Sequence, residues 1–234
     1  MAKLEKQQSD KLFITIAEGA LRQSVPEGTP DAQKRTWQAG GKSGVKNELV
    51  YNAVVGMITD VTFYDGEHEG KKFQTLNIQL DAEEGAPAPV ISAGIDTKYA
   101  GDLMKKLPNV NFDEEVRIRP FSYIPNGKEK PTTGVELMQR DPVTGNFTKK
   151  VESFFDSYDE QAKKFISKNG LPTPQGDVTR YVSDDWKIYF LQVKRFLVDY
   201  TKENISARFQ VANLPKPVEY DKTNGMNPDD IPFN

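Results

Sequence analysis

The segment Lys72–Asp81 reads KFQTLNIQLD, and its side chains alternate between two faces with period two. Leu76, Ile78 and Leu80 fall on one face, and Phe73 and Thr75 fall on the other. This alternation is typical of a β-strand with one buried face. The segment therefore predicts a strand in a sheet that has its core on one side.

Further strands and one helix are expected on both sides of this segment. The expected strands are Glu48–Tyr64, Pro89–Ile95, Glu115–Ile124 and Gly134–Gln139, and the expected helix is Lys98–Leu107. Gly56 lies inside the first strand, where a chain that serves two halves of a sheet can bend sharply. Three strands, a helix and two strands follow the order of an OB-fold, a five-stranded barrel. The alternative is another small antiparallel α+β domain with one helix.

The predicted fold class is mainly β with helical additions, in four parts. An N-terminal strand (12–17) and arm span 1–43, the OB-fold core spans 44–141, a helical extension packed on the core spans 142–212, and a flexible acidic tail spans 213–234. In the extension, the SYDE sequence at 157–160 resembles a capping box and predicts a helix that ends at Gly170. Apolar residues at three- and four-residue steps from Trp186 to Tyr200 predict a longer helix over 185–203.

Composition excludes several classes of protein. The 234 residues contain no cysteine and a single histidine, His68, so disulfide frameworks, thiolate zinc sites and multi-histidine metal sites are excluded. No apolar run reaches the ~18–20 residues that a membrane span requires. The net charge of −3 is unevenly distributed, because residues 1–44 carry a net +2 and residues 213–234 a net −2. We therefore expect a cytoplasmic, non-enzymatic protein whose local charge patches decide its partners.

The strand at 115–124 carries the strongest binding signal. Arg117, Arg119, Phe121 and Tyr123 share one face because side chains alternate along a strand. Cations that follow the phosphates and rings that stack on the bases are what single-stranded nucleic acid requires. The alternatives are a solvated sheet face or a face covered by the C-terminal helix.

Other predicted DNA-binding residues lie in loops and in the N-terminal arm. They are Lys71, Lys72 and Phe73 at the start of the second strand, Lys128 and Lys130 in the loop before 134, and Arg35 and Trp37 in the arm. In an OB-fold, the first two of these regions flank the binding groove. The arm is equally consistent with a mobile segment that contains an incidental tryptophan.

One segment resembles a catalytic motif. Asp60 or Asp65, followed by Glu69 and Lys71, is similar to the hairpin of metal-dependent nucleases, in which carboxylates hold Mg²⁺. The same residues also fit a charged turn between two strands, which is the reading we favour. No catalytic residue, metal site or cofactor is expected.

The last residues of the chain resemble a known family. Asp229, Asp230, Ile231, Pro232 and Phe233 form the sequence DDIPF, which resembles the acidic tip of bacterial single-stranded DNA-binding proteins. The resemblance implies an OB-fold that coats single-stranded DNA and a tail that recruits replication and repair proteins. These five residues are thus the predicted partner-binding site, since a ring next to carboxylates fits an apolar pocket with a basic rim.

The chain departs from that family in three ways. Asn234 follows Phe233, the linker before the tip is short, and residues 142–212 have no counterpart in the compact bacterial proteins. The chain therefore resembles a divergent, phage-encoded member, expected as a monomer or dimer rather than a tetramer.

The predicted function is sequence-independent binding of single-stranded DNA in a bacterial or phage-infected cell, during replication, recombination or repair. The alternatives are an RNA-binding OB protein, the Mg²⁺-dependent nuclease, and an adaptor that docks a partner through its long helix.

Overall fold

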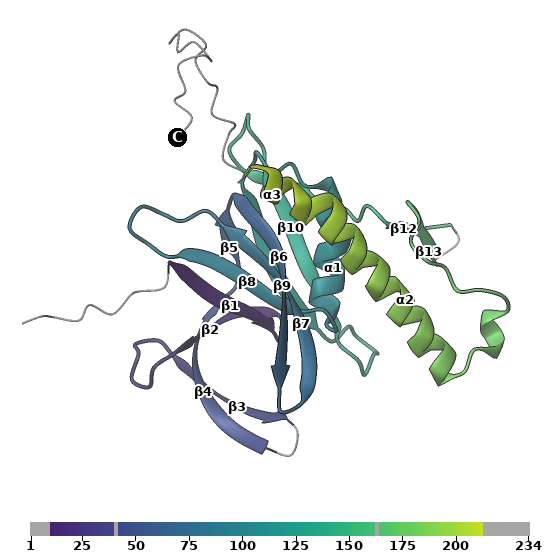
Figure 1. Cartoon of the computed structure of the whole chain (residues 1–234), viewed down its shortest axis with the longest axis horizontal. Coiled ribbons are helices and arrows are strands. Elements are labelled where there is room, and N and C mark those ends of the chain that lie inside the picture. The colour runs from purple at the N-terminus through teal and green to yellow at the C-terminus, as the bar shows by residue number, and fades with distance from the viewer. Residues whose placement is uncertain (1–9, 40–41, 162–163, 213–234) are drawn as a thin grey trace, which may run out of the picture.

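The computed structural model describes residues 10–39, 42–161 and 164–212, which form a mainly β protein with helices on one side (Figure 1). A seven-stranded sheet has the order β3-β4-β2-β1-β8-β7-β6, a four-stranded sheet has the order β11-β10-β9-β5, and β12 pairs with β13. The strands are β1 (Lys11–Ala17), β2 (Ala20–Val25), β3 (Gln33–Ala39), β4 (Lys42–Tyr51), β5 (Val54–Gly56), β6 (Ile58–His68), β7 (Lys71–Leu80), β8 (Ala88–Gly94), β9 (Val116–Tyr123), β10 (Thr132–Arg140), β11 (Phe147–Lys150), β12 (Asp156–Asp159) and β13 (Lys164–Ser167). The helices are α1 (Lys98–Lys106), α2 (Ser183–Thr201) and α3 (Ala207–Ala212), with short 3-10 turns at Leu107–Asn109 and Val178–Arg180.

The strand predicted at 12–17 is confirmed as β1, but the predicted arm after it is wrong, because β2 and β3 are also strands of the large sheet. β1 runs parallel to β8, with Ile14 opposite Ile91, and β2 joins β1 to β4. Leu21 on β2 is fully buried. The sequence did not predict this arrangement, because the pairing partner of β1 lies far along the chain. In addition, the polar residues of β2 and β3 are typical of a loop. The compact part therefore begins at β1 rather than near Gly44.

The strand predicted at 48–64 is divided among β4, β5 and β6. β5 pairs with β9, whereas β6 pairs with β7, so the chain passes from one sheet to the other at Met57. A Cβ at Gly56 would lie 2.6 Å from Asp81 Oδ1, and this carboxylate accepts a hydrogen bond from the Met57 N–H at 2.7 Å. Only glycine allows this approach, which explains the bend expected at Gly56.

Among the described residues, the mainly β class is confirmed, and the hydrogen bonds between strands form two separate larger sheets that do not close into a barrel. Helix α1 packs against both β8 and β10. Asp102 Oδ2 accepts a hydrogen bond from the Val135 N–H at 2.6 Å, and Lys106 donates to the Val135 carbonyl. Two helix side chains thus satisfy both backbone groups of a β10 residue that would otherwise need a neighbouring strand.

The core lies between the two sheets and the helices. Its largest fully buried side chains include Leu76, Ile78 and Leu80 of the alternating strand, whose predicted burial is confirmed, and Phe155. The predicted strands at 89–95, 115–124 and 134–139 and the helix at 98–107 agree with β8, β9, β10 and α1 to within a few residues.

The C-terminal helix is confirmed and is longer than predicted. α2 continues through a π-helical turn (Lys202–Ser206) into α3. Leu197, Val198 and Ile205 are buried against the core, whereas the N-terminal half of α2 is largely exposed. None of the helices in the described residues is long and apolar enough to cross a membrane.

The helix predicted over 157–170 is wrong. β12 and β13 form a hairpin in which Tyr158 lies opposite Phe165, with their ring centroids 5.3 Å apart. The segment lacks an apolar stripe at helical spacing, so a helix here would have no face to bury. Instead, the Lys168 N–H donates to the carbonyl of the buried Phe155, which holds the base of the hairpin on the core.

Candidate nucleic-acid interface

The predicted alternation along β9 is confirmed. Val116, Ile118 and Pro120 are buried, and the four predicted binding residues Arg117, Arg119, Phe121 and Tyr123 lie on the opposite, outer face. Pro120 is tolerated because β5 pairs with β9 only at 116–118, so the proline's missing N–H costs no hydrogen bond there. We call this outer face, with its β10 neighbours, the β9 surface.

The rings of the β9 surface are positioned by a glycine. Phe121 lies opposite Gly134, and a Cβ on Gly134 would be 2.8 Å from the Phe121 ring. The ring therefore lies across the glycine backbone. Tyr123 is exposed, and its ring centroid is 6.0 Å from that of Phe121. Two neighbouring rings are thus presented at the end of the strand.

The two arginines of the β9 surface share one carboxylate. Arg119 Nε lies 2.8 Å from Glu136 Oε2, and Arg117 Nη2 lies 3.8 Å from the same oxygen. Arg117 also packs over the ring of Phe147. One carboxylate neutralises only one of the two guanidinium groups, so Arg117, Arg119 and Glu136 together carry a net positive charge next to the rings.

A shallow hollow of about 790 Å³ extends the β9 surface toward β2 and β4. It is lined by Gly19, Asn52, Asp102, Lys106, Arg119, Pro120, Phe121, Ser122, Tyr123, Val135, Glu136 and Lys150. Gly19, in the turn between β1 and β2, has φ +78° and approaches so closely that a Cβ would lie 2.5 Å from the Ser122 nitrogen. The turn that leads into β2 therefore touches the end of β9.

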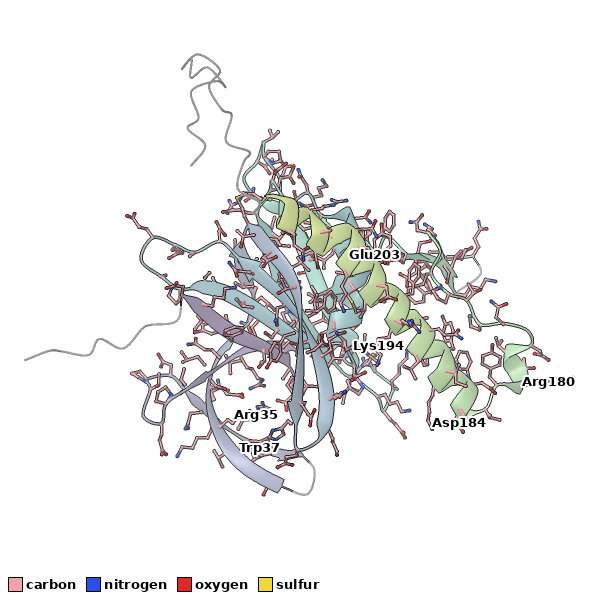
Figure 2. All side chains as sticks on the ribbon, in the orientation of Figure 1. Arg35, Trp37, Arg180, Asp184, Lys194 and Glu203 are labelled. Atoms are coloured by element: carbon pink, nitrogen blue, oxygen red, sulfur yellow. The ribbon has the colours of Figure 1, made fainter. Side chains whose placement is uncertain are left out.

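A second candidate surface lies on the curled end of the large sheet. Figure 1 shows the β3–β4 and β6–β7 hairpins curving around toward each other, and Figure 2 shows Arg35 and Trp37 on the inner side of this curl. Trp37 lies opposite Gly44, where a Cβ would be 2.8 Å from the indole Nε1. Lys46 Nζ lies 5.9 Å from the Trp37 ring. We call this inner side the curled-sheet surface.

Arg35 is held by an almost fully buried carboxylate. Glu48, whose side chain is 3% exposed, accepts hydrogen bonds from Arg35 Nε at 2.8 Å and Nη2 at 2.9 Å. Arg22 adds a third hydrogen bond to Glu48 at 3.3 Å. These hydrogen bonds, led by those from Arg35, lower the pKa of Glu48 despite its desolvation, and the same contact raises the pKa of Arg35. Much of the hydrogen-bonding capacity of Arg35 is therefore committed within the protein.

Phe73 repeats the arrangement of Trp37 and Phe121 at the end of β7. It lies opposite Gly66, where a Cβ would be 2.3 Å from the ring, and Tyr64 packs at a centroid distance of 6.2 Å. Phe73 remains 42% exposed. Lys71 shares its face, whereas Lys72 lies on the opposite face, across from Glu67.

The predicted residues thus fall into separate groups. Arg35 and Trp37 lie together on β3, and the four β9 residues lie together on the β9 surface. Lys128 and Lys130 are exposed in the loop between β9 and β10.

Three residues of these surfaces were missed by the sequence analysis: Lys46, Tyr64 and Lys150. For Lys46 and Tyr64, the hairpins that the sequence indicates would have predicted their positions. Gly40-Gly41 between two runs of strand-forming residues is typical of a hairpin turn, and the resulting pairing places Lys46 opposite Arg35. Likewise, the β6–β7 hairpin brings Tyr64 opposite Thr75, diagonal to Phe73. Lys150 joins the hollow only through the tertiary fold.

The possible nuclease residues are dispersed. Asp60 pairs with Gln79 and Asp65 with Gln74, so the two carboxylates lie on opposite faces of β6. Asp65 accepts a hydrogen bond from Gln74 at 2.5 Å. In the part of the chain that the structure describes, no group of three or more histidine, aspartate or glutamate side chains could hold a metal ion. The predicted partner-binding residues Asp229–Phe233 lie outside the described residues.

The chain matches no protein-family model, and no curated protein or solved structure is significantly similar to it. What it binds must therefore be inferred from its own residues.

Proposed function

We propose that this protein binds single-stranded DNA without sequence specificity, as a non-enzymatic component of replication, recombination or repair. The observation that carries the proposal is a repeated arrangement at three hairpins. Trp37, Phe73 and Phe121 each lie across a cross-strand glycine, at Gly44, Gly66 and Gly134. The missing side chain of each glycine lets the ring pack against the backbone of the neighbouring strand, and Phe73 stays 42% exposed there.

The chemistry of these rings suits single strands. Every base has a π-face, so stacking on aromatic side chains contributes ~1–3 kcal/mol per base with little dependence on sequence. Each ring also has a nearby cation. Lys46 lies over the Trp37 ring, Lys71 is on the same strand face as Phe73, and Arg119 is on the same strand face as Phe121. Cations next to stacking rings can follow the phosphates while the bases contact the rings.

We further propose that the core is a modified OB-fold. The order β6-β7-β8-α1-β9-β10 supports this assignment, as does the first long strand, which passes between the two sheets at Gly56 and Met57. In this interpretation, β1 pairs with the edge of β8 that β10 would otherwise take. Helix α1 lies between β8 and β10 and binds the free edge of β10 through Asp102 and Lys106. The β9 and curled-sheet surfaces then both lie on sheet faces opposite the hydrophobic core.

The first test is a fluorescence titration with oligo(dT) at several salt concentrations. The chain has two tryptophans, so Trp186→Phe leaves Trp37 as the only indole reporter. We expect quenching on binding and, if about four phosphates are neutralised, a slope of log K against log salt near −3, at ~0.7 per contact. Binding without a salt dependence would contradict the electrostatic part, and absence of binding would favour the adaptor alternative.

Two controls separate the remaining alternatives. Stronger binding to oligo(rU) than to oligo(dT) would favour an RNA-binding protein, since only RNA offers a 2′-hydroxyl. Incubation of DNA with the protein and Mg²⁺ tests the nuclease, for which cleavage would be the positive result.

We also propose that the tip Asp229–Phe233 recruits replication and repair proteins. Deletion of residues 229–234 should abolish recruitment of a replication enzyme and leave oligo(dT) binding intact. Phe233→Ala should weaken recruitment more than Asp230→Asn, because the ring provides most of the apolar contact area. Deletion of Asn234 alone is the control and should leave recruitment unchanged or improved. Equal recruitment by the six-residue deletion would contradict the proposal.

A further inference from the structure

The N-terminal half of α2 exposes apolar side chains that the core does not cover. Ile188 and Leu191 are each 57% exposed, although the C-terminal half of the same helix is buried. The helix runs past the sheets at this end (Figure 1). Trp186 and Tyr189 occupy a different side of the helix, where they pack on each other and Trp186 packs on Tyr181. Phe190, which is 60% exposed, lies on the side of Trp186 and stacks on it, so Ile188 and Leu191 form a second, smaller apolar face.

Charged residues extend this face at both ends. Asp184, Ile188, Leu191 and Arg195 follow each other at steps of four, three and four residues, which is the a/d spacing of a coiled-coil seam. The stripe is about 16 Å long at 1.5 Å per residue. It has a carboxylate at one end, a guanidinium at the other and two apolar side chains between them. We call it the α2 stripe.

We propose that the α2 stripe binds the α2 stripe of a second copy of this chain in antiparallel orientation. In an antiparallel pair, a positions face d positions. Ile188 of one copy then packs on Leu191 of the other, and Asp184 faces Arg195 at both ends. The sequence of the stripe is therefore complementary to itself in charge and in apolar contact, as a twofold interface requires.

The charges of the α2 stripe are available for this exchange. Asp184 pairs with Lys187 at 2.8 Å and Arg195 with Asp199 at 3.7 Å within the chain. Both are solvent-exposed helical pairs, which contribute little to stability and are readily replaced. Lys187 and Lys194 flank the seam, and Lys194 is neutralised by Asp96 of its own chain at 2.5 Å.

The symmetry limits the product to a dimer. An isologous contact uses the same patch on both copies, so it closes after two chains and forms no filament. Two apolar side chains per copy make a small interface, so the association should be weak and strongly dependent on concentration. This inference is independent of the DNA-binding proposal and is tested without DNA.

The test is sedimentation equilibrium of the full-length chain at low salt, from low to high micromolar concentration. We expect a monomer–dimer equilibrium that Ile188→Asp abolishes. Asp184→Arg and Arg195→Asp should each weaken the dimer roughly fivefold to tenfold, because each places like charges at both ends of the seam. The double variant Asp184→Arg/Arg195→Asp should restore it. Lys149→Asp, a charge reversal on exposed β11, is the matched control and should leave it unchanged.

Circular dichroism of each variant checks that the helix is intact. A chain that stays monomeric at every concentration would overturn the proposal. So would a dimer that Ile188→Asp does not weaken, or a double variant that dimerises no better than the single variants.

Discussion

The two candidate surfaces each contain an arginine–glutamate pair, and the pairs differ in burial. On the curled-sheet surface, the Arg35 side chain is 25% exposed and forms two hydrogen bonds to a glutamate that is 3% exposed. On the β9 surface, Arg119 is 52% exposed and pairs with Glu136, which is 25% exposed. The burial of a charged pair decides whether it is held by the fold or can be exchanged for a ligand. Arg35 is therefore expected to stabilise the sheet, and Arg119 to be available to phosphate.

The largest expected effect is on stability. Glu48→Gln should lower the free energy of unfolding by about 2–4 kcal/mol, because it leaves the partly buried Arg22 and Arg35 without their carboxylate. Urea denaturation followed by circular dichroism measures this. Glu136→Gln is the matched control and should cost less than about 1 kcal/mol, since the pair it removes is more exposed. Equal losses would mean that burial does not distinguish the two pairs.

The second effect concerns stacking. Phe121→Ala should weaken oligo(dT) binding by ~1–3 kcal/mol without changing the salt slope, because stacking releases no counterions. Tyr123→Ala and Trp37→Ala should behave in the same way, to different extents. Fluorescence anisotropy of a labelled oligo(dT) measures all three. If the slope falls together with the affinity, the rings act by positioning cations and not by stacking.

A smaller effect separates the two arginines. Arg119→Ala should make the slope of log K against log salt less steep by about 0.7, which corresponds to the loss of one phosphate contact, and should weaken binding accordingly. Arg35→Ala should lower stability but change the slope less, since Glu48 already occupies its guanidinium. The same anisotropy titrations give both slopes. A larger change of slope for Arg35→Ala would reverse the assignment of the two surfaces.

The smallest effect is a dependence of stability on pH. The pKa of Glu48 in the folded protein lies below its usual value of 4.5, so its ionised form stabilises the fold. This contribution is complete above the unfolded-state pKa and is lost as the pH falls through the lower, folded-state pKa. Between about pH 5 and pH 3, the wild-type chain should lose more stability than Glu48→Gln does. Thermal unfolding of both proteins across this pH range measures the difference. If the stability of the wild-type chain and of Glu48→Gln falls equally with pH, the role of Glu48 is contradicted.

Local patterns were sufficient for part of the fold and of the candidate site. Period-two alternation correctly placed Leu76, Ile78 and Leu80 in the core and the β9 residues on the outer face. These predictions succeeded because side-chain direction along a strand is a property of the backbone alone. Likewise, helical spacing identified the C-terminal helix, whose apolar side chains are buried along its C-terminal half.

The tertiary structure decided everything that depends on distant pairing. β1 joins the large sheet by lying parallel to β8, and β2 and β3 become strands because that sheet offers them an edge. The helix expected at 157–170 became a hairpin, since helical propensity is weak without a face to pack.

The sequence by itself determined which rings and cations share one face of a strand, and these are the residues for which nucleic-acid binding is proposed. It did not determine which cations are available. Arg35 and Arg119 have the same local context of a strand with a nearby ring, and only the fold places an almost fully buried glutamate against one and a partly buried glutamate against the other. The physical reason is that desolvation depends on what surrounds a side chain in three dimensions, whereas alternation depends only on its neighbours in the chain.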